Sequence, residues 1–297
     1  MNKRTIALFA AFVATSIFGF NHTIAKELMP DVLSPNALLY CRVVGAAISF
    51  WFISLFLKNE KIEIKDFKLI IICAFFGMGL NMITALNGLY NSTPINSAII
   101  TTIAPIFIFI ISVILLKERI TKIKYFGVFI GFIGTLTLIL LNEKSAANAP
   151  NINLGNFYFF INSLSYAIYF VLVKPLTKKY NMITIMKWLF LFSIIINMPF
   201  GLLEFSEIKW VEISGSSLIK ISYVVFCTTF LVYLLNLYAL KNLKASTVGM
   251  FIYLQPVIGI LFAIYRGADK LTVADASSVL LVFIGVYLVS KKSTQIT

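Results

Sequence analysis

The chain has 297 residues, of which 60% are hydrophobic and only 12% are charged, and its mean hydropathy is +0.93. This composition excludes an ordinary soluble globular protein, in which about a quarter of the residues are charged. The net charge of +13 would favour a nucleic-acid partner only if the basic residues formed one patch. The sequence predicts instead a polytopic membrane protein.

Ten apolar runs follow one another along the chain, each close to the roughly 20 residues that a helix needs to cross a bilayer. The predicted spans are Thr5–Ala25, Asn36–Leu57, Phe67–Leu89, Pro94–Leu116, Ile123–Leu141, Leu154–Val173, Ile183–Leu203, Leu218–Leu240, Ala245–Tyr265 and Thr272–Ser290. Continuous runs of this length predict helices, because a membrane barrel would show alternating strands of about ten residues. The first run follows Lys3 and Arg4 as a secretory signal would, but its length and the later spans predict a retained helix.

The basic residues are distributed unevenly between alternate loops. With the N-terminus in the cytoplasm, 17 of the 25 Lys and Arg residues fall in cytoplasmic segments and 6 in external ones, while Arg42 and Lys187 fall inside spans. Cytoplasmic loops of membrane proteins carry such an excess. The pattern predicts a multi-pass protein of the cell (inner) membrane with both termini in the cytoplasm. The charge then reports topology and attraction to lipid, and no nucleic-acid partner is expected.

The second half of the chain repeats the pattern of the first half. The aligned pairs are Pro105 with Pro256, Glu118 with Asp269 and Gly134 with Gly285 at a shift of 151 residues, and Lys26 with Lys174 at a shift of 148. The pattern predicts two five-span repeats, over residues 1–144 and 152–292. Because five is odd, the second repeat starts on the opposite membrane face, so the repeats are inverted. Inverted repeats are frequent in secondary transporters, whose substrate site lies near the midplane between the halves.

Several motifs carry a family resemblance. They are "FGFNHTIAK" from Phe18 to Lys26, "SPNALLYCR" at the start of the second span, and the hairpins "KERIT" and "ADKLT" that follow Pro105 and Pro256. Together with the five-plus-five organisation, they resemble the drug/metabolite transporter superfamily, specifically its EamA-domain exporters. Phe18 stands where that family frequently has Trp. The resemblance implies a bundle whose first, third, fourth, sixth, eighth and ninth helices surround a central cavity, and it implies export.

Polar side chains inside the spans are the candidate substrate-binding residues, because polar groups in hydrocarbon are costly unless they face a cavity or another helix. The candidates are Asn21, His22, Asn81, Thr84, Asn87, Thr101, Asn162, Tyr166, Tyr169, Tyr233, Asn236, Tyr253 and Gln255. They offer hydrogen bonds and aromatic surfaces without a fixed charge, which favours a neutral or zwitterionic substrate. Hydrogen bonding between helices is the alternative for each of them.

Three ionisable residues inside the spans have two interpretations each. His22, the only histidine, can carry a coupling proton because it titrates near neutral pH, or it can be a packing residue. Arg42 and Lys187 lie near the ends of their spans, which favours side chains that snorkel to the interface. Anchoring an anionic substrate group is the alternative for both.

Pro105 and Pro256 each lie about eleven residues into a span, where a proline bends a helix. The bend can be a static kink or a hinge for alternating access. Its occurrence at equivalent points of both repeats favours the hinge.

The remaining residues argue against an enzyme. All twelve acids lie in loops or near span ends, and the spacing of the three cysteines matches neither a metal site nor a disulfide. We therefore expect no catalytic residues, no metal and no cofactor. The sequence predicts a secondary active exporter of small neutral or zwitterionic metabolites such as amino acids, working as a monomer or homodimer by alternating access among membrane lipids. The alternative is a non-transporting membrane protein, such as a lipid-modifying enzyme or an assembly partner.

Overall fold

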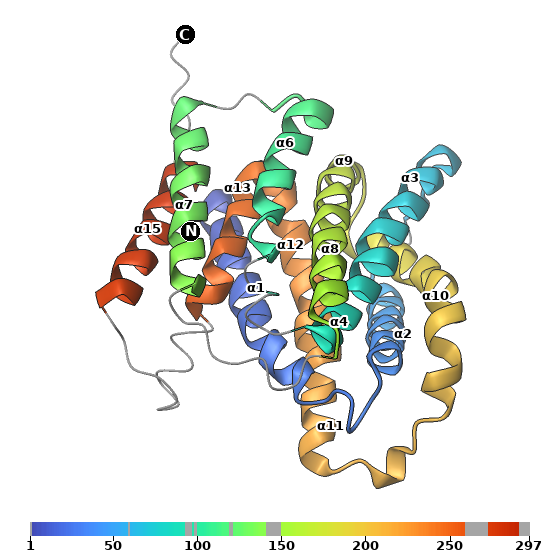
Figure 1. Cartoon of the computed structure of the whole chain (residues 1–297). Coiled ribbons are helices and arrows are strands. Elements are labelled where there is room, and N and C mark those ends of the chain that lie inside the picture. The colour runs from blue at the N-terminus through green and yellow to red at the C-terminus, as the bar shows by residue number, and fades with distance from the viewer. Residues whose placement is uncertain are drawn as a thin grey trace.

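The structure is a computed structural model that describes residues 2–58, 60–92, 97, 100–118, 121–140, 150–258 and 273–290. Every regular element within these residues is a helix (Figure 1). Six helices or continuous helical runs in the described part of the chain are long and apolar enough to cross a membrane. The predicted all-α membrane fold is confirmed.

The first half begins with two helices that start at side-chain caps. Asn2 accepts a hydrogen bond from the amide of Arg4, and Ser34 accepts one from the amide of Ala37, with Pro35 in the first turn. The helices of this half are α1 (Lys3–Lys26), α2 (Pro35–Ser54), α3 (Ile64–Ala74) running through the π-helix η1 (Phe75–Leu80) into α4 (Asn81–Asn91), then α6 (Ala104–Leu116) and α7 (Lys122–Leu140).

The second half repeats this order. Its helices are α8 (Ile152–Leu172) with the short α9 (Lys174–Lys179), α10 (Met182–Ser206), the turn η2 (Trp210–Glu212), α11 (Gly215–Ser222) running through the π-helix η3 (Tyr223–Leu231) into α12 (Val232–Asn242), α13 (Ala245–Gly249) with the 3-10 turn η4 (Met250–Tyr253), and α15 (Val273–Ser290). Asn151, Asn181 and Ser214 cap α8, α10 and α11 with their side chains.

The predicted spans agree with these helices to within a few residues at most ends. The span Pro94–Leu116 is one continuous helix only from Ala104, and Ala245–Tyr265 is described only to Ile258. The number of ten transmembrane helices therefore stays a prediction. Asp269, the repeat partner of Glu118, lies outside the described residues.

Large apolar side chains face outward along the helices. Phe52, Phe129 and Phe157 are each about 60% exposed, and Leu203 is 72% exposed. A water-soluble protein rarely leaves so many large apolar groups on its surface. This surface suits a multi-pass protein in lipid.

The helices of the two halves pack in matching pairs. In the described residues α4 packs on α8 as α12 packs on α1, α10 packs on η1 as α2 packs on η3, and α2 and α10 pack on each other. The π-helices also match, because Phe75 and Tyr223 are separated by the 148 residues that align Lys26 with Lys174. Exchanging the two halves therefore preserves these pairs.

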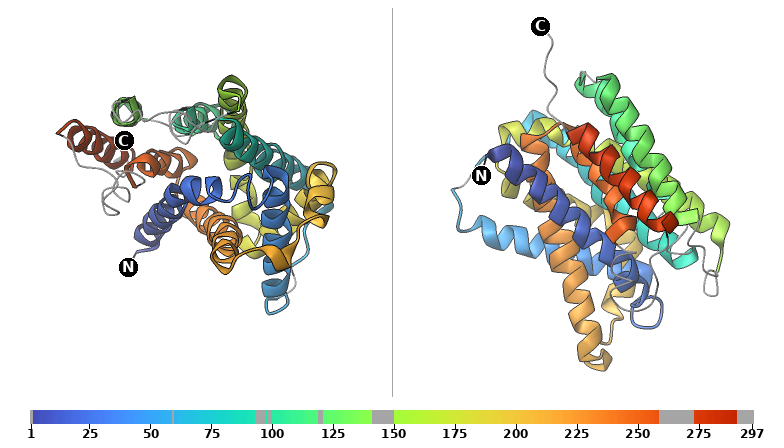
Figure 2. Two further views of the ribbon diagram at one scale, coloured as in Figure 1. Left: turned by 60° about the horizontal axis from the view of Figure 1, so that its bottom comes forward. Right: turned by 90° about the vertical axis from the view of Figure 1, so that its left-hand side faces the viewer.

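The helices α7 and α15 form a further pair at one side of the bundle (Figure 2). A Cβ atom added to Gly285 would lie 2.7 Å from the carbonyl oxygen of Gly127, so the two backbones meet at glycines. Small residues at such crossings are typical of membrane helices.

The loops gather at two opposite ends of the bundle. In Figure 1 the start of α3, the end of α6 and α9 lie at the upper end, whereas the start of α11 and the end of α4 lie at the lower end. We call the upper end the Lys174 end and the lower end the Glu204 end. The Lys174 end holds loops that the charge pattern predicts to be cytoplasmic.

Candidate functional site

A cavity of about 110 Å³ lies between the two halves, inside the bundle. Its lining comes from α1, α2, α4, α8 and α12, together with residues just before α6 and around η4. One water needs about 10–15 Å³ by this kind of measure, so the cavity has room for several waters or a small solute. A larger hollow of about 580 Å³ at the Glu204 end is lined by loops and helix ends. None of the predicted substrate-binding residues lines it.

The cavity brings together seven of the predicted site residues. They are Asn21, Asn81, Thr101, Asn162, Tyr166, Tyr233 and Gln255. Phe18 also lines the cavity and supplies an aromatic ring from α1. The lining includes residues of all six helices that the family resemblance implied, and α2 adds Arg42.

Five of the other predicted residues lie outside this lining. Thr84 donates to the carbonyl of Leu80 in its own helical run (2.6 Å), and Asn87 donates to Asn36 Oδ1 (3.2 Å). Asn236 lies behind the lining and donates to the hydroxyl of Tyr166 (3.4 Å). Tyr169 and Tyr253 are almost fully buried. The side chain of His22 lies outside the described part of the structure.

The π-helix η1 is held by side chains of the second half. Ser165 Oγ donates to the carbonyl of Phe76 (2.7 Å), Tyr233 Oη to that of Gly77 (3.2 Å), and Asn197 Nδ2 to that of Met78 (3.3 Å). A π-helix shifts the hydrogen-bond register and often marks a functional site. These three donors come from α8, α12 and α10, so they fix the cavity wall on the third span against three helices of the other half.

Arg42 is buried in the cavity wall, with 4% of its surface exposed. Its Nε donates to Thr229 Oγ1 (2.9 Å), and the hydroxyl of Thr229 itself donates to the carbonyl of Val224, five residues earlier in η3 (2.8 Å). The π-helical register thus orients the oxygen of Thr229 toward Arg42. Gly45 permits this approach, since a Cβ atom there would lie 2.4 Å from Val225 Cγ1.

The favoured interpretation of Arg42 as a snorkelling residue is wrong. Snorkelling requires a path to the interface, but α2 packs between α10 and η3, and the guanidinium points into the bundle. Lys187 is also buried, and its Nζ lies 5.0 Å from the ring centroid of Trp51, a cation–π distance. Lys187 does not line the cavity.

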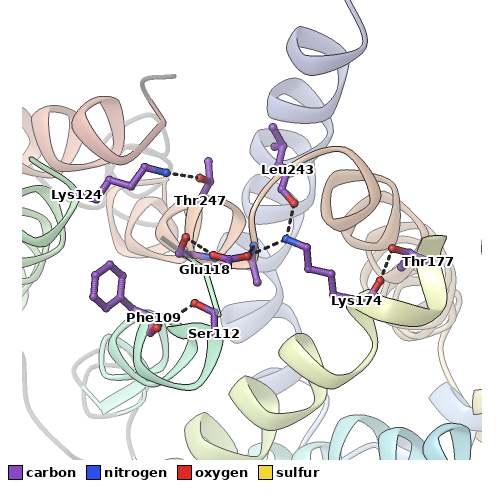
Figure 3. A network of polar contacts seen from close by, with 10 residues as sticks. Phe109, Ser112, Glu118, Lys124, Lys174, Thr177, Leu243 and Thr247 are labelled. Carbon is purple, nitrogen blue, oxygen red and sulfur yellow. Dashed lines mark hydrogen bonds and ion pairs between the residues drawn. The ribbon is translucent and has the colours of Figure 1, made fainter. Parts of the chain in front are cut away.

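A polar cluster joins the two halves at the Lys174 end (Figure 3). Glu118 Oε1 accepts from Lys174 Nζ (2.9 Å) and from the amide of Ala245 (2.9 Å), and Glu118 Oε2 accepts from Ser246 Oγ (2.8 Å). Lys174 Nζ also donates to the carbonyl of Leu243 (2.8 Å). We call these five residues the Glu118 clamp, which ties the end of α6 to α9 and to the start of α13.

The turn after α6 directs Glu118 into this clamp. Lys117 has a left-handed backbone conformation (φ 50°), and its amide and that of Glu118 donate to the carbonyl of Ser112. Burial by itself raises the pKa of Glu118, but the charge of Lys174 and the donated hydrogen bonds outweigh it and hold the pKa below its usual value.

Sequence reasoning gave Arg42 a place at the substrate site only as the alternative to snorkelling, and it missed the clamp. Gly45, one helical turn after Arg42, was the available signal for close packing on that face of α2. The repeat alignment singled out Glu118 and Lys174 separately, but no pattern joined them. Pro105 lies in the first turn of α6 after a turn at Thr102 and Ile103, and Pro256 follows the 3-10 turn η4.

The described residues contain no cluster of His, Cys, Asp and Glu that could hold a metal ion. They also place no carboxylate in the cavity lining. Its fixed charge is the guanidinium of Arg42, so within the described residues the site is a polar, cationic cavity in an apolar bundle.

Comparisons with known proteins agree with this architecture. An uncharacterized transporter from Archaeoglobus fulgidus is 31% identical over 264 residues, which cover 88% of this chain and 90% of that protein. The uncharacterized transporter YetK from Bacillus subtilis is 25% identical over 67% of this chain and 60% of its own length. A crystal structure with 15% identity superposes with a TM-score of 0.75 over 95% of both chains, which shows the fold alone. The EamA-like transporter family matches residues 5–140 and 153–291, so the chain belongs to this family of membrane transporters.

Proposed function

We propose that the protein is a secondary active transporter that exports small neutral or zwitterionic metabolites, such as amino acids, by alternating access of the central cavity. The observation that carries this proposal is the cavity itself, which gathers polar side chains from both halves inside an apolar bundle. Membrane transporters built from inverted repeats bind their substrates at such a position.

The Glu118 clamp supplies one closed gate in this proposal. It joins α6 of the first half to α9 and α13 of the second at the Lys174 end. At the Glu204 end, Lys26 Nζ donates to the carbonyls of Leu89 (2.7 Å) and Tyr90 (3.2 Å), so the aligned lysines Lys26 and Lys174 both tie helix ends. Because the matching helix pairs are preserved when the halves are exchanged, a rearrangement that opens one end has a counterpart that closes it and opens the other.

Several parts of the proposal rest on the sequence. The repeats comprise residues 1–144 and 152–292, both termini face the cytoplasm of the cell (inner) membrane, and His22 carries the coupling proton. Pro105 and Pro256 act as hinges, and the irregular backbone just before each proline supports this role.

Flux measurements in proteoliposomes test the proposal. Purified protein is reconstituted, and efflux of a panel of radiolabelled amino acids and neutral metabolites is followed with and without a pH gradient, with protein-free liposomes as the control. We expect saturable flux of at least one solute, accelerated by the gradient. Flux that ignores the gradient would remove the proton coupling. No flux for any solute would favour the alternative of a non-transporting membrane protein.

A further inference from the structure

We propose that Arg42 and Asn21 form a recognition site for a small carboxylate that carries an amino or hydroxyl group close to the carboxyl group. This inference rests on the proposed transport function and narrows its substrate class. The two residues come from α2 and α1 and line the same cavity. The site would accept α-amino acids and 2-hydroxy acids, and it would discriminate against their esters and amides and against cations.

The guanidinium of Arg42 supplies the charge for this recognition. Arginine stays charged in proteins, and an isolated charge buried in an apolar bundle is unfavourable without a counter-ion. Within the described part of the chain Arg42 forms no ion pair, and its single hydrogen bond joins Nε to Thr229 Oγ1. The two terminal amino groups are therefore left for a ligand. A carboxylate matches them with two parallel charge-assisted hydrogen bonds.

Asn21 supplies an acceptor for a second group of the ligand. The side chain of Asn21 is 8% exposed, and its Oδ1 is buried without a hydrogen-bond partner among the described residues. A buried amide oxygen is costly to leave unpaired. An ammonium, amine or hydroxyl group of the ligand would satisfy it, whereas a methyl group would not.

Two of the other three amides of the lining, Asn81 and Asn162, already donate to backbone carbonyls, and Gln255 is the third. Asn81 Nδ2 donates to the carbonyl of Asn162 (3.2 Å), and Asn162 Nδ2 donates to the carbonyl of Asn81 (2.9 Å), so the two residues tie α4 to α8. Tyr233 donates to the carbonyl of Gly77. Among the described lining residues, Arg42 supplies the charge, and Asn21 Oδ1 is the buried acceptor that lacks a partner, so these two groups set the polarity that a ligand must match.

The charge balance of the cavity selects against cations. No carboxylate among the described residues lines the cavity, so a cationic solute would add a second positive charge to Arg42. The carboxylate of a ligand neutralises the charge of Arg42, and in a zwitterion the ammonium group donates a hydrogen bond to Asn21 Oδ1. The volume of about 110 Å³ restricts such ligands to small ones.

Matched substrates test the proposal on the unmodified protein. Uptake into proteoliposomes is measured for L-alanine, L-serine and L-threonine, for their primary amides and methyl esters, and for L-lactate and propionate. We expect the amides and esters to be transported at least about tenfold less efficiently than the parent acids, and propionate about tenfold less efficiently than L-lactate. Equal transport of acids and amides would overturn the proposal.

Variants then assign the discrimination to the two residues. In Arg42→Gln we expect KM for the amino acids to rise about 10- to 100-fold and the preference for acid over amide to vanish. Arg42→Lys should keep part of that preference, because lysine keeps the positive charge but cannot bind a carboxylate through two parallel hydrogen bonds. In Asn21→Leu the preference for L-lactate over propionate should vanish while the preference for acid over amide remains.

The matched control is Lys187→Met, which removes another buried cation at a position outside the cavity and should keep both preferences. An unchanged preference for acid over amide in Arg42→Gln would overturn the assignment. Flux of other small solutes with none of these carboxylates would overturn this inference and leave the transport function standing. Absence of any flux would instead overturn the transport function itself.

Discussion

Two buried cations, in the Glu118 clamp and in the central cavity, have opposite surroundings. Lys174 has a carboxylate partner at 2.9 Å and also donates to a backbone carbonyl at 2.8 Å. Arg42 is buried at least as deeply, but its protein partner in the described residues is a single neutral hydroxyl group. One cation has its counter-ion within the chain, and the other lacks it.

This difference separates a structural charge from a functional one. A buried ion pair such as Glu118 and Lys174 fixes the relative position of the elements that carry it, and removing one partner leaves an uncompensated charge. An unpaired charge in the bundle has no structural benefit, and our proposal explains it by a ligand of opposite charge. In this proposal the clamp holds a conformation and the cavity binds a substrate.

The largest expected effect is on the free energy of unfolding, and it differs between variants of Lys174 and Arg42. Lys174→Met leaves the Glu118 carboxylate without a counter-ion, and we expect it to lower the free energy of unfolding by about 3–5 kcal/mol. Arg42→Met removes an unpaired charge and one hydrogen bond, so we expect a change within about 1 kcal/mol. Unfolding followed by tryptophan fluorescence in detergent measures both. Equal losses in the two variants would remove the distinction.

The second effect concerns the gate. Glu118→Gln weakens the clamp, and we expect net transport to fall about tenfold while a cysteine placed in the cavity becomes more reactive from the Lys174 end. A variant with both Glu118→Gln and Lys174→Gln should recover part of the activity, because neither charge is then unpaired. Unchanged cavity accessibility in Glu118→Gln would contradict the gate.

The pH dependence of the clamp follows from the lowered pKa of Glu118. A carboxyl group with a depressed folded-state pKa contributes stability above its unfolded-state pKa, and this stability is lost as the pH falls through the folded-state value. The clamp should therefore stay intact from about pH 5.5 to about pH 8. Burial also lowers the pKa of Lys174, the ion-pair partner. The ratio of wild-type to Glu118→Gln transport should be constant over that window, and a ratio that changes there would show that Glu118 or Lys174 titrates within it.

A smaller effect distinguishes lining residues from their neighbours. Asn21 lines the cavity, whereas Asn87 bonds to Asn36 outside the lining. We expect Asn21→Leu to raise KM about tenfold and Asn87→Leu to change it by less than about threefold. Transport assays on the two variants at matched expression measure this, and the reverse order would move the site toward Asn87.

The smallest expected effect is at the proline before the α6 helix. Pro105 follows a turn at Thr102 and Ile103, and Pro105→Ala lets the helix continue across that turn. We expect turnover to slow by about two- to fivefold with little change in KM, because a stiffer segment moves less readily. An unchanged turnover number would show that the bend is only architectural.

The sequence predicted the helices better than the site. Apolar runs of membrane length locate helices almost without tertiary information, and the shift of 148 residues that aligns Lys26 with Lys174 also separates Phe75 from Tyr223, where the two π-helices begin. The rotation of each helix is set by packing, so spacing could not separate Asn81, which lines the cavity, from Thr84 and Asn87, which do not. The π-helices η1 and η3 further change which residues of their spans face the cavity, and no sequence pattern predicted these π-helices. Arg42 was misread because its distance from a span end does not reveal how closely Gly45 lets α2 approach η3.

The most direct test of the claim that Arg42 binds a ligand is stabilisation of the protein by that ligand. Unfolding of the wild type, Arg42→Gln and Lys187→Met is measured with and without a transported amino acid at about 100 times its Kd for the wild type. We expect the ligand to stabilise the wild type and Lys187→Met by about 2.7 kcal/mol and Arg42→Gln by far less. Equal stabilisation of all three proteins would contradict it.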